Sequence, residues 1–372
     1  MIYLDYQATT PLAPEAFDAM LPWLRDHFGN PHSQHRMGRQ AAAVVEVARG
    51  QITEAIGLEG EVVVTSGATE ALNIALVGAA RAMRAADPAR IRVLTLVSEH
   101  AAVRDTVLAL ADEGFEPVLL PVEADGIVAL ERVVEACDHR TALLSAMLVN
   151  NEIGVIQPVD ALCDIAHEAG ALFICDAVQG FTRVPLPKGA DMIAMSAHKI
   201  YGPKGVGALW HRPGLSIPPL IHGGGQEKGW RSGTLSPALC VGFGVAADLA
   251  RQRAQVDDAH IRALYATVRN LFRNWTVNGS ETQRYFGNIN IRQDDMDAAR
   301  LMSECRDVAF SLGSACASGS GRPSHVLQAI GLSDKQARGS VRIGFGRYTT
   351  QDALEDAARR IDEAAARQRV VP

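Results

Sequence analysis

The chain of 372 residues lacks the main features of membrane, disulfide-rich and nucleic-acid-binding proteins. It has only six cysteines and no Cys-x-x-Cys pair, so neither a disulfide framework nor an intrinsic metal site is expected. The longest run without a charged residue, 232–247, is shorter than the ~20 apolar residues that a membrane span needs. With 36 basic and 42 acidic residues the formal net charge is −6, which is not the basic balance typical of nucleic-acid binding.

The first residues do not read as a targeting segment either. Asp5 lies where a secretory signal would carry its basic and apolar regions. We therefore expect a cytoplasmic protein without a membrane or nucleic-acid partner. Its length, at roughly 150 residues per domain, predicts about two domains.

Residues 61–210 repeat one pattern, in which a short apolar run is followed by a polar cluster and a helix-like stretch. This pattern predicts an α/β fold with a mainly parallel sheet flanked by helices. The expected strands are 62–65, 93–97, 142–149, 172–175, 192–195 and 206–210. Because ligands of such sheets bind outside the carboxyl ends of the strands, the polar clusters after the first five strands are expected to converge.

The composition changes after residue 210, where prolines and glycines precede a second kind of pattern. A smaller α+β unit is expected there. Its expected elements are a helix around 261–275, strands at 289–291 and 341–345, and a last helix with one apolar face.

Two residues in the first region suggest a particular cofactor. Lys199 follows an expected buried strand, where desolvation would lower its pKa and favour a Schiff base, although nearby Lys204 is an alternative. Asp176 ends another strand and needs a cationic partner to offset its burial. Pyridoxal phosphate needs a lysine for its aldehyde and an acid for its protonated ring nitrogen.

The phosphate of that cofactor would need hydrogen-bond donors. Residues 66–69 open an expected helix, whose free N–H groups and positive dipole end favour an anion. Ser196, His198 and Thr234 could add side-chain donors. The glycine-rich run 202–207 lacks the lysine-hydroxyl ending of a nucleotide-binding loop, so ATP is not expected.

Three more side chains are candidates for chemistry. His100 could stack on the cofactor ring and move protons, because its pKa lies near the working pH. Arg342 is a charged residue in an alternating apolar strand and could bind a substrate carboxylate with both arms. Cys316 lies in a glycine- and serine-rich run, 311–321, which predicts a moving, reactive thiol that accepts sulfur; the other five cysteines are expected to pack.

With these residues in view, the whole chain resembles the group I cysteine desulfurases, pyridoxal-phosphate enzymes of the class V aminotransferase family and fold type I. The motifs that carry the resemblance are Leu4-Asp5-Tyr6, Ala8-Thr9-Thr10, Gly29-Asn30-Pro31, Ser66-Gly67-Ala68-Thr69-Glu70, Asn150-Asn151-Glu152-Ile153-Gly154, Asp176 with Gln179, Ser196 with His198-Lys199, Arg231-Ser232-Gly233-Thr234, Gly313-Ser314-Ala315-Cys316 and Val341-Arg342. The fold it implies has a large cofactor-binding domain at 13–252 and a small domain formed by 1–12 and 253–372.

The resemblance also implies a role for each site residue. Lys199 would carry pyridoxal phosphate, Asp176 would pair with the ring nitrogen, Gln179 would bond the ring hydroxyl, and His100 would stack above the ring. The implied phosphate site consists of Ala68, Thr69, Ser196 and His198, completed by Thr234 from the other subunit of a homodimer. Asn151 and Arg342 would contact cofactor and substrate, and Cys316 would carry the persulfide.

The implied reaction converts L-cysteine to L-alanine and leaves the sulfur on Cys316. The sulfur would then pass to an iron-sulfur scaffold or another acceptor protein, and Cys316 could briefly contact a cluster. The loop at 311–324 resembles the longer loop of group I, whereas the segment after Arg342 is shorter than the tail with which housekeeping members dock their scaffold. The identity of the acceptor is therefore left open.

Two other functions remain compatible with parts of the sequence. An aminotransferase or a carbon-sulfur lyase would use the same cofactor residues without needing a mobile thiol. A non-catalytic sulfur-relay protein would keep Cys316 beside a vestigial pocket. A requirement for Cys316 would distinguish a cysteine desulfurase from the first alternative. A cofactor bound to Lys199 would distinguish it from the second.

Overall fold

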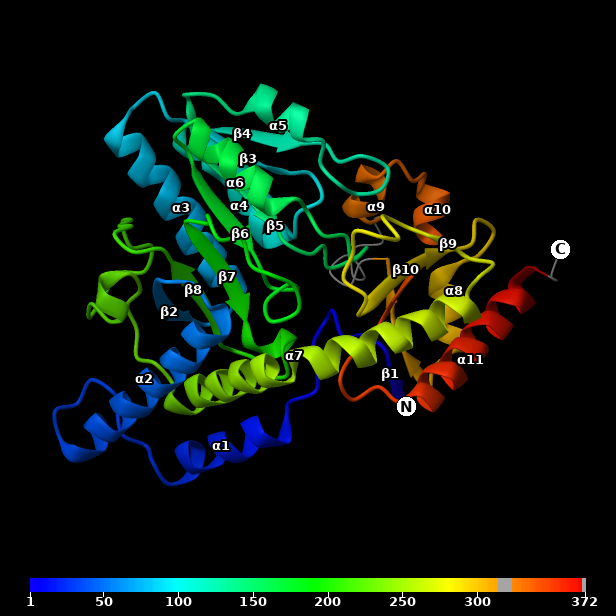
Figure 1. Ribbon diagram of the computed structural model, residues 1–372, viewed down its shortest axis with the longest axis horizontal. Coiled ribbons are helices and arrows are strands. Elements are labelled where there is room, and N and C mark those ends of the chain that lie inside the picture. The colour runs from blue at the N-terminus through cyan, green and yellow to red at the C-terminus, as the bar shows by residue number, and fades with distance from the viewer. Residues whose placement is uncertain (314–322, 370–372) are drawn as a thin grey trace.

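The computed structural model describes residues 1–313 and 323–369. Its central element is a seven-stranded sheet in the order β2-β8-β7-β6-β5-β3-β4 (Figure 1). The strands are β2 (Glu61–Thr65), β3 (Arg92–Leu96), β4 (Glu116–Leu120), β5 (Thr141–Met147), β6 (Leu172–Asp176), β7 (Met192–Ser196) and β8 (Gly207–His211). Only β8 is antiparallel to its neighbours, β2 and β7. The prediction of a mainly parallel α/β sheet is confirmed.

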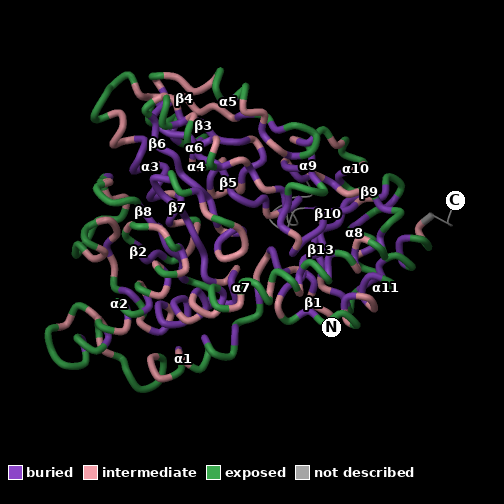
Figure 2. Tube along the Cα trace, viewed as in Figure 1, coloured by how far each residue is buried: buried purple, intermediate pink, exposed green. Residues whose placement is uncertain are grey.

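Helices cover both faces of this sheet. On one face α3 (Ala68–Ala86) and α4 (Ala101–Ala109) pack on side chains such as Val93 and Ile174. On the other face α2 (Arg36–Ile56) and α6 (Val159–Glu168) pack on the alternate residues, such as Leu94 and Phe173. Since both faces are covered, the strands other than the edge strand β4 are buried almost along their full length, as Figure 2 shows in purple.

A second, antiparallel sheet has the order β12-β13-β10-β9. Its strands are β9 (Thr276–Val277), β10 (Asn288–Arg292), β12 (Ser311–Leu312) and β13 (Ser340–Gly344). Near it lie α8 (Ala298–Glu304), α9 (His325–Ala329), α10 (Asp334–Arg338) and α11 (Gln351–Arg369). The strands and the last helix expected from the sequence are present in this part of the molecule.

The N-terminus lies beside this second sheet rather than beside the first helices (Figure 1). Strand β1 (Ile2–Tyr3) pairs in parallel with β11 (Val308–Ala309). Residues 4–12 then run toward the central sheet, and α1 (Pro14–Arg25) follows. The first residues therefore connect the second sheet to the carboxyl edge of the first.

The longest helix, α7 (Pro237–Leu271), reaches from α1 and α2 to α11. The sequence predicted a helix only around 261–275, which is wrong at both ends. The earlier part of α7 is buried against α2 and is apolar on more than one side, so it lacks the periodic pattern of a surface helix. The domain limit expected between 252 and 253 falls inside this helix, and the domain division stays a prediction.

The sequence also did not indicate β4. This strand lies at the edge of the central sheet and contains Pro117, which weakens a strand pattern and is tolerated at an edge. The remaining short elements are α5 (Leu130–Ala136) and the 3-10 turns η1 (Leu110–Glu113), η2 (Ala197–Lys199) and η3 (Glu227–Gly229). Within the described residues, none of the helices has the length and apolar character needed to cross a membrane.

Candidate functional site

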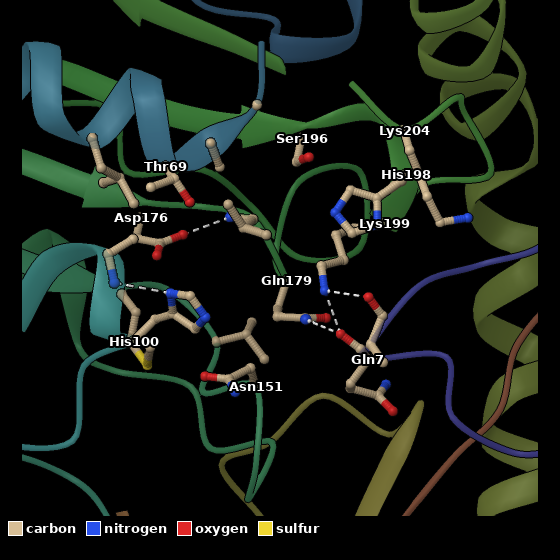
Figure 3. Close-up of a pocket in the computed structure, with 18 of the residues that line it drawn as sticks. Gln7, Thr69, His100, Asn151, Asp176, Gln179, Ser196, His198, Lys199 and Lys204 are labelled. Carbon is tan, nitrogen blue, oxygen red and sulfur yellow. Dashed lines mark hydrogen bonds between the residues drawn. The ribbon is translucent and has the colours of Figure 1, made fainter. Parts of the chain in front are cut away.

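The polar clusters that follow five strands of the central sheet line one cavity of about 450 Å³ (Figure 3). The convergence expected from the sequence is therefore observed for the described residues. Those of the predicted site residues that line the cavity are Ala68, Thr69, His100, Asn151, Asp176, Gln179, Ser196, His198, Lys199 and Arg342. Thr234 is described but is not among the lining residues, and Cys316 lies outside the described residues.

Lys199 lies at the end of η2, directly after β7. Its Nζ donates hydrogen bonds to the carbonyl oxygens of Gln7, at 2.5 Å, and Ala8, at 2.9 Å. Gln179 Nε2 donates to the same Gln7 oxygen at 2.9 Å (Figure 3). Lys204 also lines the cavity, but it is exposed while Lys199 is half-buried. Burial favours Lys199 as the lysine with the altered chemistry.

Asp176 is the last residue of β6 and is only 5% exposed. Its Oδ1 accepts a hydrogen bond from the Val178 N–H at 2.9 Å. Burial raises the pKa of this carboxyl, while the Val178 N–H, the His100 ring when it is protonated and the Lys199 ammonium oppose the shift. A cationic ligand group beside Asp176 would favour the charged carboxylate.

His100 caps the first turn of α4 and points into the cavity (Figure 3). Its Nδ1 accepts the Ala102 N–H at 3.1 Å, so the neutral ring carries its hydrogen on Nε2. Asn151 lies nearby, and its buried Oδ1 has no hydrogen-bond partner among the described residues. An orphaned acceptor in a cavity indicates that a ligand donor belongs there.

The first turn of α3 forms one part of the cavity wall. The helix begins at Ala68, so its first N–H groups have no partner within the helix. Strand β8 approaches this turn closely, because a Cβ on Gly207 would lie 2.7 Å from Gly67 Cα. Two donors from β7 and η2, Ser196 and His198, line the same cavity. Backbone donors at a helix start are suited to a phosphate.

His198 is neutral in this environment. Burial and, to a smaller extent, the charges of Lys199 and Lys204 together lower its pKa from 6.5 to about 4. Its Nδ1 lies 3.1 Å from Thr9 Oγ1, which fixes the ring. His198 can therefore give a phosphate a hydrogen bond but not a positive charge.

Arg342 reaches the cavity from β13 in the second sheet and is 1% exposed. Its Nη1 donates to the Asn151 carbonyl at 2.9 Å, and its Nη2 donates to Asp5 Oδ1 at 2.8 Å. Ser311 Oγ also donates to Asp5 Oδ1 at 2.8 Å. Asp5 therefore fixes the guanidinium beside Asn151.

Sequence reasoning assigned no role to Gln7, Ala8 or Asp5. Gln7 and Ala8 act through their backbone carbonyl oxygens, which every residue has, so their side chains gave no signal. Asp5 was noted only as a charge that argues against a targeting segment and as part of a motif. The sequence feature that could have identified Asp5 is its position among apolar residues at the start of the chain. A carboxylate in such surroundings needs a cationic partner, which here is Arg342.

A family model described as "Aminotransferase class-V" matches residues 2–356. The chain belongs to the class-V aminotransferase family. "Cysteine desulfurase IscS" of Rickettsia bellii (strain OSU 85-389) is 42% identical over 371 residues, which cover 97% of this chain and 90% of that protein.

Solved structures are similar over nearly the whole chain. One described as "NIFS-LIKE PROTEIN" has a TM-score of 0.91 and 30% identity, covering 98% of this chain and 99% of that one. Another, "SspA in complex with cysteine", has a TM-score of 0.84 and 33% identity, covering 94% of this chain and 100% of that one. The fold of this protein is therefore that of the NifS-like proteins.

The cofactor of this family is pyridoxal phosphate. The cavity fits it by the chemistry of its donors. It offers a half-buried lysine for an aldehyde, a buried acid for a ring nitrogen and the start of α3 for a phosphate. The unpaired Asn151 oxygen adds an acceptor for a polar group of the ligand.

Proposed function

We propose that this protein is a cysteine desulfurase, which converts L-cysteine to L-alanine and transfers the sulfur to Cys316 as a persulfide. The observation that carries the proposal is the meeting of Lys199, Asp176 and the start of α3 with Arg342 in one cavity. The relative named cysteine desulfurase, which matches 97% of the chain, supports the reaction. The neighbour solved with cysteine supports the substrate.

Pyridoxal phosphate would be held by residues around the cavity. Lys199 would bind its aldehyde, Asp176 its ring nitrogen and Gln179 its ring hydroxyl, with His100 above the ring. The N–H groups of Ala68 and Thr69, with Ser196 and His198, would bind the phosphate. When bound, the cofactor supplies an electron sink for the pair released at the substrate carbon.

The substrate would lie between the cofactor and the second sheet. Arg342 would bind the substrate carboxylate, because its guanidinium is fixed by Asp5 and the Asn151 carbonyl at the cavity wall. Asn151 Oδ1 would accept a hydrogen bond from cofactor or substrate. Lys199 and His100 are the groups that could move a proton at the substrate carbon.

The sulfur step needs a thiol, and the described residues that line the cavity include no cysteine. The Cys316 thiolate would attack the sulfur of bound L-cysteine, forming a sulfur-sulfur bond as the carbon-sulfur bond breaks. The substrate carbon would gain a proton and leave as L-alanine. The persulfide would then pass its outer sulfur to an acceptor.

We also propose the assembly and the partners. The protein would act as a cytoplasmic homodimer in which Thr234 of each chain completes the phosphate site of the other; Thr234 is exposed and is absent from the lining of its own cavity. The sulfur acceptor would be an iron-sulfur scaffold or another acceptor protein.

Incubation with L-cysteine followed by mass spectrometry tests the reaction. The expected products are alanine and one extra sulfur on Cys316, and the variant Cys316→Ala should keep the cofactor absorbance but lose both. Pyruvate or sulfide formed at the full rate by that variant would instead favour a carbon-sulfur lyase. A protein that takes up no borohydride-reducible cofactor on Lys199 would favour a non-catalytic relay.

A further inference from the structure

Residues 221–236, here called the 221–236 loop, precede α7 and hold a strained backbone. Glu227 and Lys228 have φ values of 49° and 53°, in the left-handed region that side chains with a Cβ rarely adopt. Such a conformation persists only where surrounding contacts stabilise it, and it is often found at functional sites. The contacts of this loop therefore indicate which of its residues it positions.

Glu227 attaches the middle of the loop to the central sheet. Its buried carboxylate pairs with Arg49 Nη1 at 2.8 Å and accepts the Val64 N–H at 2.6 Å. Lys228 pairs with Glu61 at the start of the same strand, but both side chains are exposed. The Glu227 contact accounts for the strained conformation, whereas an exposed pair contributes little.

Arg231 attaches the loop to the start of α3. Its Nε donates to Glu70 Oε1 at 2.7 Å, and the other oxygen of Glu70 accepts the Ser66 N–H at 2.6 Å. Burial opposes ionisation of Glu70, but the Arg231 and Ser66 hydrogen bonds outweigh it and hold the pKa of Glu70 below its ordinary value. One carboxylate thus links Arg231 to the turn that forms the phosphate site.

Arg231 also directs the chain toward Thr234. Its Nη1 donates to the Gly233 carbonyl at 3.2 Å, and the Gly233 N–H donates to Gln226 Oε1 at 2.8 Å. Gly233 has a φ of 126°, and a Cβ there would lie 2.8 Å from Arg231 Nη1. The guanidinium therefore occupies the space beside Gly233 and fixes the backbone immediately before Thr234, which is exposed.

We propose that Glu70 and Arg231 form a positioning pair that ties the phosphate site of one subunit to the loop that presents Thr234 to the phosphate of the other subunit. The inference rests on the homodimer proposed above. It gives a direct connection, of one ion pair, between the two cofactor sites. Loss of the pair would loosen cofactor held by the neighbouring subunit.

Hybrid dimers of the holoenzyme test this proposal. In the first hybrid one chain carries Lys199→Ala with Arg231→Gln, and the other chain is wild type. Only the wild-type chain can then hold cofactor on a lysine, and its phosphate site is completed by the altered loop of the other chain. In the second hybrid Arg231→Gln is on the chain that keeps Lys199, and its partner carries only Lys199→Ala. The readout is the cofactor retained on Lys199 after dilution, trapped with borohydride and counted by mass spectrometry.

We expect cofactor loss to be about tenfold faster in the first hybrid and nearly unchanged in the second. A tenfold change corresponds to the free energy of about one charge-assisted hydrogen bond. Lys228→Ala, which removes the exposed pair on the same loop, is the matched control and should release cofactor at the wild-type rate. Glu70→Gln keeps one oxygen as an acceptor but loses the negative charge that pairs with Arg231. When it replaces Arg231→Gln in the first hybrid, it should also speed the release of cofactor from the wild-type chain.

Faster loss only in the second hybrid, or in neither, would overturn the proposal. Equal loss in both hybrids together with a lowered melting temperature would overturn it as well, because it would indicate a general folding defect. A wild-type protein that is monomeric in solution has no neighbouring cofactor site, so this result would also contradict the proposed role of the Glu70–Arg231 pair. The reaction itself is judged separately, by whether wild-type protein forms alanine from L-cysteine.

Discussion

One wall of the cavity is made by the ends of neighbouring strands in the central sheet, whereas another is made by residues close to the two ends of the chain. The first, here called the sheet wall, includes Asp176 and His198. The second, here called the terminal wall, consists of Gln7, Ala8 and Arg342. The sheet wall carries the groups suited to a cofactor, while the terminal wall carries the cation suited to a substrate carboxylate.

This difference separates two properties that an enzyme has to combine. The sheet wall is rigid, because its groups follow buried strands that are hydrogen-bonded to one another. In the terminal wall, Arg342 lies in the paired strand β13, whereas Gln7 and Ala8 lie outside any strand. Long-range contacts such as the Arg342 bond to Asp5 join the two segments. Changes in the sheet wall should therefore affect cofactor binding and chemistry, and changes in the terminal wall should affect mainly the substrate.

The largest effect is expected where the two walls meet. Lys199 belongs to the sheet wall but bonds the Gln7 and Ala8 carbonyls. Lys199→Ala should lower alanine formation by at least about a thousandfold and abolish borohydride-trapped cofactor, because it removes both the covalent link and a proton-transfer group. The exposed Lys204 is the matched control; near-normal trapping in Lys199→Ala with loss in Lys204→Ala would reverse the assignment.

The next effect concerns two buried acids of the sheet region. Asp176→Asn should weaken cofactor retention and lower kcat by about a hundredfold, because a neutral amide does not stabilise a protonated ring nitrogen. Glu99 is fully buried beside Asp176, and burial raises its pKa well above the ordinary value. Because burial favours the protonated form of Glu99, which a glutamine resembles in shape and charge, Glu99→Gln should change kcat little.

Absorbance titration of the bound cofactor and steady-state kinetics measure both variants. The comparison fails if Glu99→Gln is as damaging as Asp176→Asn. That result would mean that a charge on Glu99, rather than its shape, is needed at the site.

A smaller effect is expected in the terminal wall. Arg342→Lys should raise KM for L-cysteine by roughly ten- to a hundredfold with less change in kcat, because an ammonium cannot make the two-armed contact with a carboxylate. Asp5→Asn should give a smaller rise, since it loosens the guanidinium without removing it. A fall in kcat at unchanged KM in both variants would contradict the assignment of this wall to the substrate.

The last effect is expected on stability, through its dependence on pH, and not on activity. Glu152 follows Asn151, and burial raises its pKa from 4.5 to about 7, opposed by a hydrogen bond from Ser324 and by the charge of Arg342. Between these values the folded chain binds a proton that the unfolded chain has lost, so the contribution of Glu152 to stability is full below about pH 4.5 and is lost as the pH rises to about 7. The contribution lost is at most about 3 kcal/mol.

Urea unfolding of wild type and Glu152→Gln at several pH values measures this contribution. His198 has a lowered pKa and acts in the opposite direction, so the difference between the two proteins is the informative quantity. That difference should change between about pH 4.5 and 7 and be constant above it. Glu123→Gln, at an exposed glutamate, should show no such change, and a flat difference for Glu152→Gln would refute the shift.

Much of the sheet wall could be predicted because neighbouring strands obey a general rule. An apolar run followed by a polar cluster marks a strand end, and parallel strands bring those ends to one edge. Lys199, Asp176 and the helix start at Ala68 were found in this way. The terminal wall could not be predicted from such a rule, since no local pattern indicates that Gln7 lies beside Lys199.

Helix α7 shows the same limit at the level of the fold. Its later part has the periodic apolar pattern of a half-exposed helix and was expected, whereas its earlier part packs on several sides and reads as an ordinary apolar run. The exposed position of Thr234 likewise depends on the strained path of the 221–236 loop. The ion pairs that stabilise this path join residues more than a hundred and fifty positions apart.

The sequence by itself determined the class of fold, the cofactor and the residues that follow each strand, because the apolar runs that form buried strands and the polar clusters after them are local patterns. The reactive role predicted for Cys316 also comes from the sequence, and that residue lies outside the described part of the structure. Only the tertiary structure brought Asp5 and Gln7 to Arg342 and Lys199, and Arg231 to Glu70. These contacts join distant segments through backbone carbonyls and ion pairs, whose partners are set by packing rather than by sequence spacing.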